Sequence, residues 1–156
     1  MNFFLKFLTK QQNNEGIDLC LYLKGVTEET GDFRRLIRCY EYNQYLKMPA
    51  KASANLNLST ITLTKKVDRF TPVLNLAAAT NLTIPDAILY FFNNKTKKIH
   101  YMITLYDVFI SSTRQYLKPG KDLCDTFTLG FDKIKWEYNS TSTSWNITRR
   151  KPLLCA

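Results

Sequence analysis

The chain has few of the residues on which enzymes and nucleotide-binding proteins depend. It contains one histidine and only five glycines, and neither a GxxxxGK(S/T) nor a GxGxxG pattern occurs, so the usual phosphate-binding loops are absent. His100 has Met102 and Thr104 at alternate positions, neither of which is an acid that could orient it, and we interpret it as a structural or surface residue. The candidate acid/base carboxylates are scattered: Asp68, Asp107, Asp125 and Asp132. We predict that the protein is not an enzyme and uses no cofactor.

Cysteines are few and show no metal-binding spacing. The four cysteines are Cys20, Cys39, Cys124 and Cys155, and no CxxC pair occurs among them. The first three lie in stretches with a strand pattern, where a free cysteine behaves as a small buried hydrophobic residue. We therefore expect free thiols, a fold formed in a reducing cytoplasm, and no metal site.

Long hydrophobic runs are also missing. No stretch of the sequence is long and apolar enough to span a membrane as a helix. The segment 1–10 has an apolar run that Lys6 interrupts, and no small-residue cleavage site follows it. We expect no membrane insertion, a start in the cytoplasm, and any export to proceed without a cleaved signal peptide.

Alternating apolar residues are abundant, and they predict strands. Hydrophobic residues make up 45% of the chain and aromatic residues 13%, which excludes a disordered protein. A period of two is clearest at 17–24, where Ile17, Leu19, Leu21 and Leu23 alternate with other residues. Similar stretches lie at 36–45, 58–67, 87–92, 99–110, 123–129 and 134–138. About seven strands with one short helix predict a mainly β domain over 1–156, a small barrel or sandwich with its core at about 17–138.

The one helix signal follows Asp68, which we interpret as a turn residue. Thr71 is suited to cap the free N–H groups of a helix, and Pro72 is suited to the first helical position. The spacing predicts a helix over 72–80, ended by Asn81 in a left-handed conformation. Its apolar face would carry Val73, Leu76 and Ala77.

Two segments lack a regular period. Residues 46–57 follow neither a helical nor a strand pattern, and we expect an extended loop there. Residues 139–144 are rich in Ser and Thr, and we expect a loop followed by a tail within 139–156.

The formal charge of +9 is compatible with an acidic partner, but the basic residues occur as short separated pairs, which favours lysines spread over solvated strand faces. Arg38, Tyr40 and Tyr42 would share one face of a strand. Such a face suits stacking on single-stranded nucleic acid, and it also suits packing on the sheet or on a neighbouring subunit. Both interpretations are compatible with the sequence.

Two segments resemble a known family. In 61–79, Asp68, Thr71, Pro72 and Leu74 fall at the positions of a strand-to-helix passage of haemolysin-coregulated proteins (Hcp), which form the inner tube of the bacterial type VI secretion system. In 127–138, a Leu-x-Phe-x-x-Ile-x-Trp-x-Tyr pattern that contains Ile134, Trp136 and Tyr138 looks like the closing strands of that family. Residues 101–108 resemble the strand between them, so the resemblance runs from about 17 to 138.

The sequence also departs from the family pattern. The segment 46–57 has no glycine, and the strong positive charge is unusual. Either 3–8 or 17–24 could supply the first strand.

The resemblance implies a structural role. Hcp proteins form hexameric rings of β-barrels that stack into a secreted tube and can carry small effector proteins in the lumen. The implied partners are copies of the chain itself and the sheath, baseplate and spike proteins of the secretion machine, with no nucleic acid. We expect the loop 46–57 to contact the neighbouring copy through Leu46, Lys47, Met48, Lys51 and Leu56. The alternatives are a phage-like tail-tube protein and a basic β-barrel that binds single-stranded nucleic acid.

Overall fold

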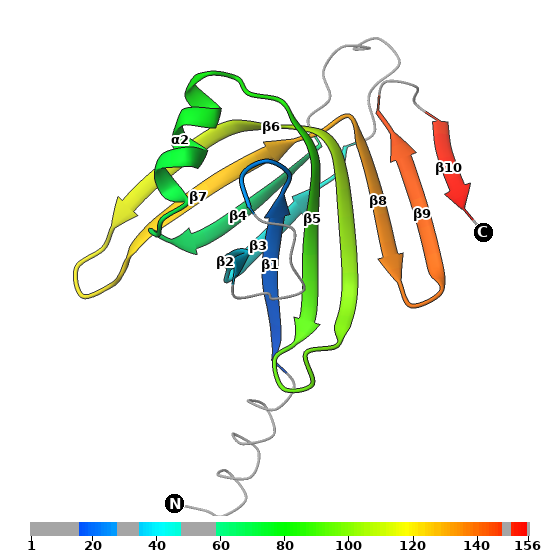
Figure 1. Ribbon diagram of the computed structural model, residues 1–156, viewed down its shortest axis with the longest axis horizontal. Helices are drawn as coiled ribbons and strands as arrows, with labels where there is room; N and C mark the ends of the chain where they lie inside the picture. The colour runs from blue at the N-terminus through cyan, green and yellow to red at the C-terminus, as the bar shows by residue number, and fades with distance from the viewer. Residues whose placement is uncertain (1–15, 28–34, 48–58, 148–150, 156) are drawn as a thin grey trace, which may run out of the picture.

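A computed structural model describes residues 16–27, 35–47 and 59–147, together with the backbone of 151–155. The described part contains one helix, α2 (Thr71–Ala79), and ten strands. The strands are β1 (Ile17–Leu23), β2 (Ile37–Cys39), β3 (Glu41–Tyr45), β4 (Thr60–Lys66), β5 (Ile84–Asn93), β6 (Ile99–Leu117), β7 (Leu123–Gly130), β8 (Lys133–Tyr138), β9 (Thr141–Asn146) and β10 (Lys151–Cys155). The mainly β prediction is therefore confirmed (Figure 1).

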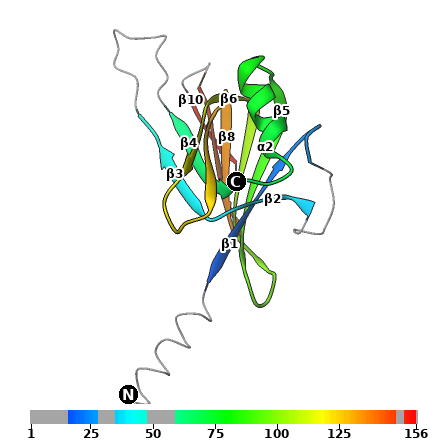
Figure 2. The same ribbon diagram turned by 90° about the vertical axis from the view of Figure 1, so that its left-hand side faces the viewer.

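The strands form two sheets that share β6. The long sheet has the order β2–β1–β5–β6–β8–β9–β10, and the short sheet has the order β3–β4–β7–β6. The chain bends at Tyr40 between β2 and β3, where the Tyr40 N–H donates to the Thr64 carbonyl at 3.0 Å. Figure 2 shows the chain passing from β2 on one side of the molecule to β3 on the other. Because β2 pairs with β1 and β3 pairs with β4, the path of paired strands returns to its start and makes a small barrel.

Strand β6 belongs to both sheets because it is long and bent. Its first half pairs with β5 and β8, and its second half, 109–117, pairs with β7. Asp107 has a left-handed backbone, and the register shifts between Ile110 and Ser112. Such irregularities let one strand turn from one sheet into another. The strand continues past the predicted end at Ile110, because β7 supplies a partner for the added residues.

The barrel interior follows the alternation seen in the sequence. In the long sheet, Leu21 and Leu23 are fully buried, and in the short sheet Ile61, Leu63 and Phe127 face them. Burying each such side chain contributes about 1.5–3 kcal/mol relative to leaving it in water. Strand β1 fills the predicted 17–24 position, and residues 3–8 lie outside the described part.

Helix α2 differs from its prediction in start and in orientation. Its N-cap is Phe70, with no side-chain cap, because the Thr71 hydroxyl is engaged in the barrel instead. The buried face carries Thr71, Leu74 and Ala77, so the predicted face with Val73 and Leu76 inward was wrong.

The end of the helix agrees with the sequence. Asn81 has φ 51°, and the N–H groups of Asn81 and Leu82 donate to the carbonyls of Ala78 and Ala77. This pair of bonds is a Schellman motif, and the left-handed Asn81 is confirmed.

The predicted loop at 139–144 is largely a strand. Residues Asn139 and Ser140 make the turn between β8 and β9, and Asn139 has φ 51°. Trp145 lies opposite Ile134 in the β8–β9 ladder, and this apolar pair favours a strand over a Ser/Thr loop. We call β8, β9 and β10 the C-terminal wing, because they extend the long sheet beyond the barrel (Figure 1).

Among the described residues, no helix has the length and apolarity needed to cross a membrane.

Candidate functional site

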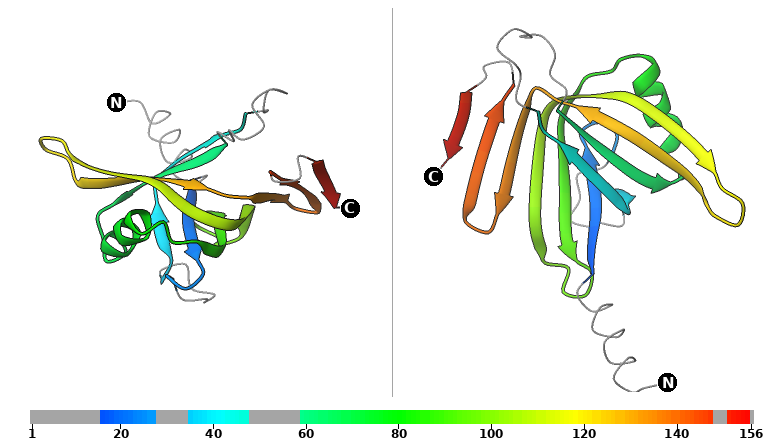
Figure 3. Two further views of the ribbon diagram at one scale, coloured as in Figure 1. Left: turned by 90° about the horizontal axis from the view of Figure 1, so that it is seen from above. Right: turned by 180° about the vertical axis from the view of Figure 1, so that it is seen from behind.

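The short sheet has two open edges. Strand β3 pairs only with β4, and residues 109–117 of β6 pair only with β7, as far as the described residues extend. Each edge presents a row of backbone N–H and C=O groups without a neighbouring strand. Figure 3 shows β3 and the β6–β7 hairpin at opposite sides of this sheet. A sheet with one open edge on each side can accept a strand from another chain at both.

The edge at β3 is held by a cluster around Gln44. The Gln44 Oε1 atom accepts hydrogen bonds from Tyr42 Oη and from Trp136 Nε1, each at 3.0 Å. The ring of Tyr42 packs edge-on against Phe91 with 5.0 Å between centroids. Burial raises the pKa of Tyr42, so its hydroxyl stays protonated and remains a donor. Trp136 was predicted as a family position; Gln44 was not, because its partner lies 92 positions away.

The start of helix α2 is held by a buried lysine. The side chain of Lys65 is 0% exposed, and its Nζ donates at 2.8 Å to Asp68 Oδ1, Thr71 Oγ1 and Asp125 Oδ2. The Thr71 hydroxyl also donates to Asp125. These bonds tie the ends of β4 and β7 to the helix.

The charges in this cluster support one another. Burial alone would raise the pKa of Asp125, but hydrogen bonds from Lys65 and Thr71 outweigh it and hold the pKa below its usual value. A buried charge survives only with such partners. Lys65 was not predicted as a buried residue. Its position was a signal, because Lys65 falls on the same side of β4 as the inward-facing Ile61 and Leu63.

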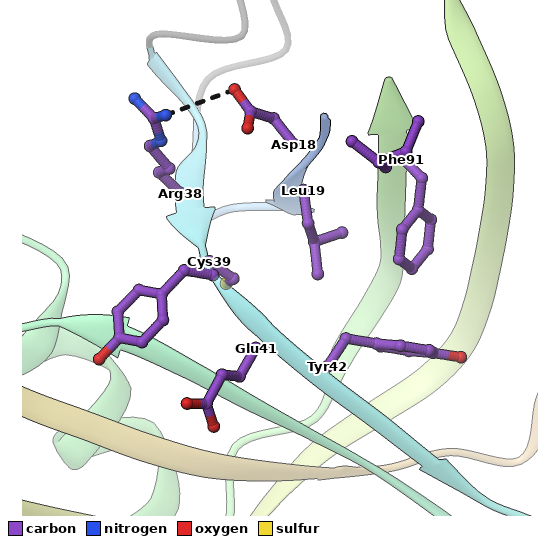
Figure 4. Close-up of a pocket in the computed structure, with 9 residues that line it drawn as sticks. Asp18, Leu19, Arg38, Cys39, Glu41, Tyr42 and Phe91 are labelled. Atoms are coloured by element: carbon purple, nitrogen blue, oxygen red, sulfur yellow. Dashed lines mark hydrogen bonds and ion pairs between the residues drawn. The ribbon is translucent and has the colours of Figure 1, made fainter. Parts of the chain in front are cut away.

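A recess of about 360 Å³ lies beside the bend between β2 and β3 (Figure 4). Arg38 and Asp18 form an ion pair of 3.3 Å at its rim, and Glu41 and Phe91 line it. Burial raises the pKa of the Cys39 thiol well above its ordinary value, so this thiol is protonated and a poor nucleophile. No group of three metal-binding side chains occurs in the part of the chain that is described.

The expected shared face of Arg38, Tyr40 and Tyr42 does not form. The bend at Tyr40 sends Arg38 to Asp18, while the Tyr40 hydroxyl lies 2.7 Å from Cys124 Sγ. Tyr42 points inward to Phe91. These residues therefore make no common surface on which bases could stack. The expected shared face, on which the nucleic-acid alternative depended, was wrong.

The remaining predicted positions have separate surroundings. Leu74 and Ile134 are buried in the core, whereas Pro72 is exposed. Asp68 Oδ1 accepts a bond from the Phe70 N–H at 2.9 Å. Tyr138 is half exposed, and its ring contacts His100.

Two of the predicted loop contacts can be located. Leu46 and Lys47 are exposed just after β3, and the Lys47 N–H donates to Ser59 Oγ at 3.2 Å. Met48, Lys51 and Leu56 lie outside the described residues.

Comparisons with known proteins agree with this architecture. The structure is similar to the crystal structure of Hcp1 from Salmonella typhimurium, with a TM-score of 0.74 and 17% identity over 88% of this chain and 100% of that chain. It is also similar to a type VI secretion system effector from Yersinia pestis, with a TM-score of 0.68 and 15% identity over 83% and 99% of the two chains. At these identities the likeness shows the fold.

The sequence itself carries the family assignment. No curated protein matches it significantly. Residues 24–138 match the family model described as "Type VI secretion system effector, Hcp". This match spans most of the chain, and it shows that the protein belongs to the Hcp family of the type VI secretion system.

Proposed function

We propose that copies of the chain close into hexameric rings by joining the two open edges of the short sheet, and that these rings stack into a secreted tube. The chain is a tube subunit of the type VI secretion system, as its family is. The observation that supports the ring is the pair of open edges, β3 on one side and residues 109–117 on the other. Joining unlike edges of successive copies is a head-to-tail contact, and such contacts generate a ring when the rotation closes.

The same arrangement determines which face looks into the ring. One face of the short sheet is covered by the barrel core. In a closed ring there is more space outside than inside, so the barrel, which is the bulk of each subunit, lies on the outer side. The other face then lines the lumen. In one row across this face stand Asn43, Thr62, Thr128 and Ser112, and in the next stand Glu41, Thr64, Thr126 and Arg114.

This face has little net charge. The hydroxyls of Thr62 and Thr128 lie 3.2 Å apart, as do those of Thr64 and Thr126. The positive charge of the chain therefore lies mainly elsewhere. We propose that effector cargo meets a neutral, hydroxyl-rich surface, so that its retention depends on hydrogen bonds more than on charge.

Other contacts complete the proposal. Leu46 is an exposed apolar residue next to the β3 edge, and the segment that follows it, through Lys47, Met48, Lys51 and Leu56, reaches the neighbouring copy. Sheath, baseplate and spike proteins are the further partners. Assembly starts in the bacterial cytoplasm, and export proceeds without a cleaved signal peptide.

Engineered disulfides test the edge contact. In one chain, Asn43 and the β6 positions 112 and 114 lie three strand spacings apart, roughly 14 Å, beyond the reach of a disulfide. We combine Asn43→Cys with Ser112→Cys or with Arg114→Cys in turn, because the structure of one chain does not set which residues of β3 and β6 pair between copies. Oxidation should link copies into a ladder that ends at the hexamer for at least one pair.

Two controls accompany this experiment. Each single cysteine variant should yield no ladder, and negative-stain imaging should show rings. A protein that stays monomeric at high concentration and forms no ladder with any pair would contradict the proposed ring. Deleting 47–54 should leave a folded chain with weaker ring formation, seen by size-exclusion chromatography with light scattering; unchanged rings would remove the loop from the interface.

A further inference from the structure

Helix α2 turns an uncharged apolar face to solvent. Val73 is 43% exposed and Leu76 is 65% exposed. Residues 70–85 contain no charged side chain, although charged residues make up 22% of the chain. The outer face of a solvated helix normally carries charged or polar residues. A contiguous apolar face of this kind marks a contact surface.

A second apolar feature lies on the same side of the molecule. Leu117 and Leu123 face each other across the β6–β7 hairpin and are 69% and 44% exposed. They share a sheet face with Asp125, two positions from Leu123, and Asp125 contacts Thr71 at the start of the helix. The helix and the leucine pair therefore both lie on the core side of the short sheet, beside the open edge of β6.

The C-terminal wing lies over the other open edge of the short sheet, which is the edge of β3. Gln44 lies opposite Ile61 in the β3–β4 ladder, so its side chain is on the core side of the sheet. Its bond from Trp136 Nε1 shows that the inner face of β8 looks onto that side at the β3 edge. Trp145 and Thr143 continue the same inner face on β9, and both are only partly buried.

These two surfaces lie far apart in one chain, with α2 and the wing at opposite sides in Figure 1 and in Figure 3. When the open edge of β6 in one copy pairs with the open edge of β3 in the next copy, the two short sheets become continuous. The core-side face of the first copy's short sheet then lies beneath the C-terminal wing of the second copy. We propose that helix α2, through Val73 and Leu76, docks under the wing of the neighbouring copy against Trp145 and Thr143. This contact rests on the proposed ring, and it names a second, side-chain component of the ring interface.

A charge placed on the helix tests the contact. Leu76→Lys should leave the monomer's melting temperature and circular dichroism unchanged, because Leu76 is largely exposed, while the ring dissociation constant rises at least tenfold in sedimentation velocity. The matched control is Thr96→Lys in the β5–β6 turn, at the opposite end of the molecule from the helix; it adds the same net charge and should weaken assembly far less than Leu76→Lys does.

A crosslink gives an independent readout. Leu76→Cys combined with Thr143→Cys should link different copies and give the same ladder of oligomers as the edge cysteines. Intact rings with Leu76→Lys and no Leu76–Thr143 link, together with a ladder from the edge cysteines, would overturn the helix contact and leave the ring in place. Absence of rings and of every ladder would overturn both.

Discussion

At the scale of single residues, Lys65 shows how a charge can serve inside a barrel. Its ammonium group has three protons and finds Asp68, Thr71 and Asp125 at 2.8 Å each. Taking such a group out of water costs several kcal/mol unless partners replace the water. The cluster therefore fixes where the helix starts more than it adds net stability, and it explains why Thr71 does not cap the helix.

Thr71→Val tests the hydroxyl in this cluster. It removes a donor to Asp125 and an acceptor for Lys65, so buried groups lose their partners, and we expect a loss of about 1–3 kcal/mol in the free energy of unfolding. Thr71→Ser keeps the oxygen and should cost less, about 0.8 kcal/mol for one buried methyl group. Urea denaturation measures both, and equal losses would show that the hydroxyl is unimportant.

The pH dependence of stability follows from Asp125. Its pKa is lower in the folded chain than in the unfolded chain, so its contribution is present above the unfolded pKa and disappears as the pH falls through the folded value. We expect the free energy of unfolding to decline below about pH 4, the ordinary range for aspartate. Asp125→Asn should flatten this decline in urea denaturation at a series of pH values. An unchanged slope would assign the acid sensitivity to other carboxylates.

At the scale of elements, one amide joins the two sheets. Gln44 on β3 accepts bonds from Trp136 on β8 and from Tyr42. Strand β3 pairs with β4 on one side, and its other edge pairs with no strand in the described chain. The bond from Trp136 is therefore the contact that holds this edge at a set distance from the C-terminal wing. The width of the space that we assign to the neighbouring helix depends on this bond.

Gln44→Leu should weaken both the fold and the assembly. It leaves the Trp136 N–H and the Tyr42 hydroxyl without their acceptor, at a cost of about 1–3 kcal/mol. Gln44→Glu keeps an acceptor oxygen and serves as the control. Sedimentation velocity at concentrations where both variants are folded should show the larger assembly defect in Gln44→Leu, and equal assembly of the two would contradict a positioning role.

The elements also show the limits of sequence patterns. The period of two in β1 and β4 predicts the buried faces correctly apart from Ile17, which is 46% exposed at the start of β1, because alternate side chains must point to opposite sides of a strand. The helix face was wrong, since a nine-residue helix offers several apolar stripes and only packing selects one. Strand β9 was missed because Thr and Ser in a strand look like a loop until the Trp145–Ile134 pair is known.

At the scale of the whole molecule, charge opposes assembly. Each copy carries a formal +9, and neither open edge offers a matching acidic row. We expect ring formation to strengthen as NaCl rises from 0.1 M to 1 M, because the Debye length falls from about 10 Å to about 3 Å. Analytical ultracentrifugation measures this.

A charge-reduced chain is the control. Lys95→Glu with Lys98→Glu, both in the exposed β5–β6 turn, should assemble more readily at low salt and respond less to added NaCl. Rings that dissociate at 1 M NaCl would show that ion pairs hold the interface together.

The sequence by itself determined the class of this protein. Alternating apolar residues specify strands locally, and the motifs around Pro72 and Trp136 identify the family, because both signals lie within short stretches of chain. The tertiary structure decided what those residues face. The partners of Lys65, the bond from Trp136 to Gln44 and the two open edges of the short sheet join segments far apart in the chain, and no local pattern records which strands lie side by side or which remain unpaired.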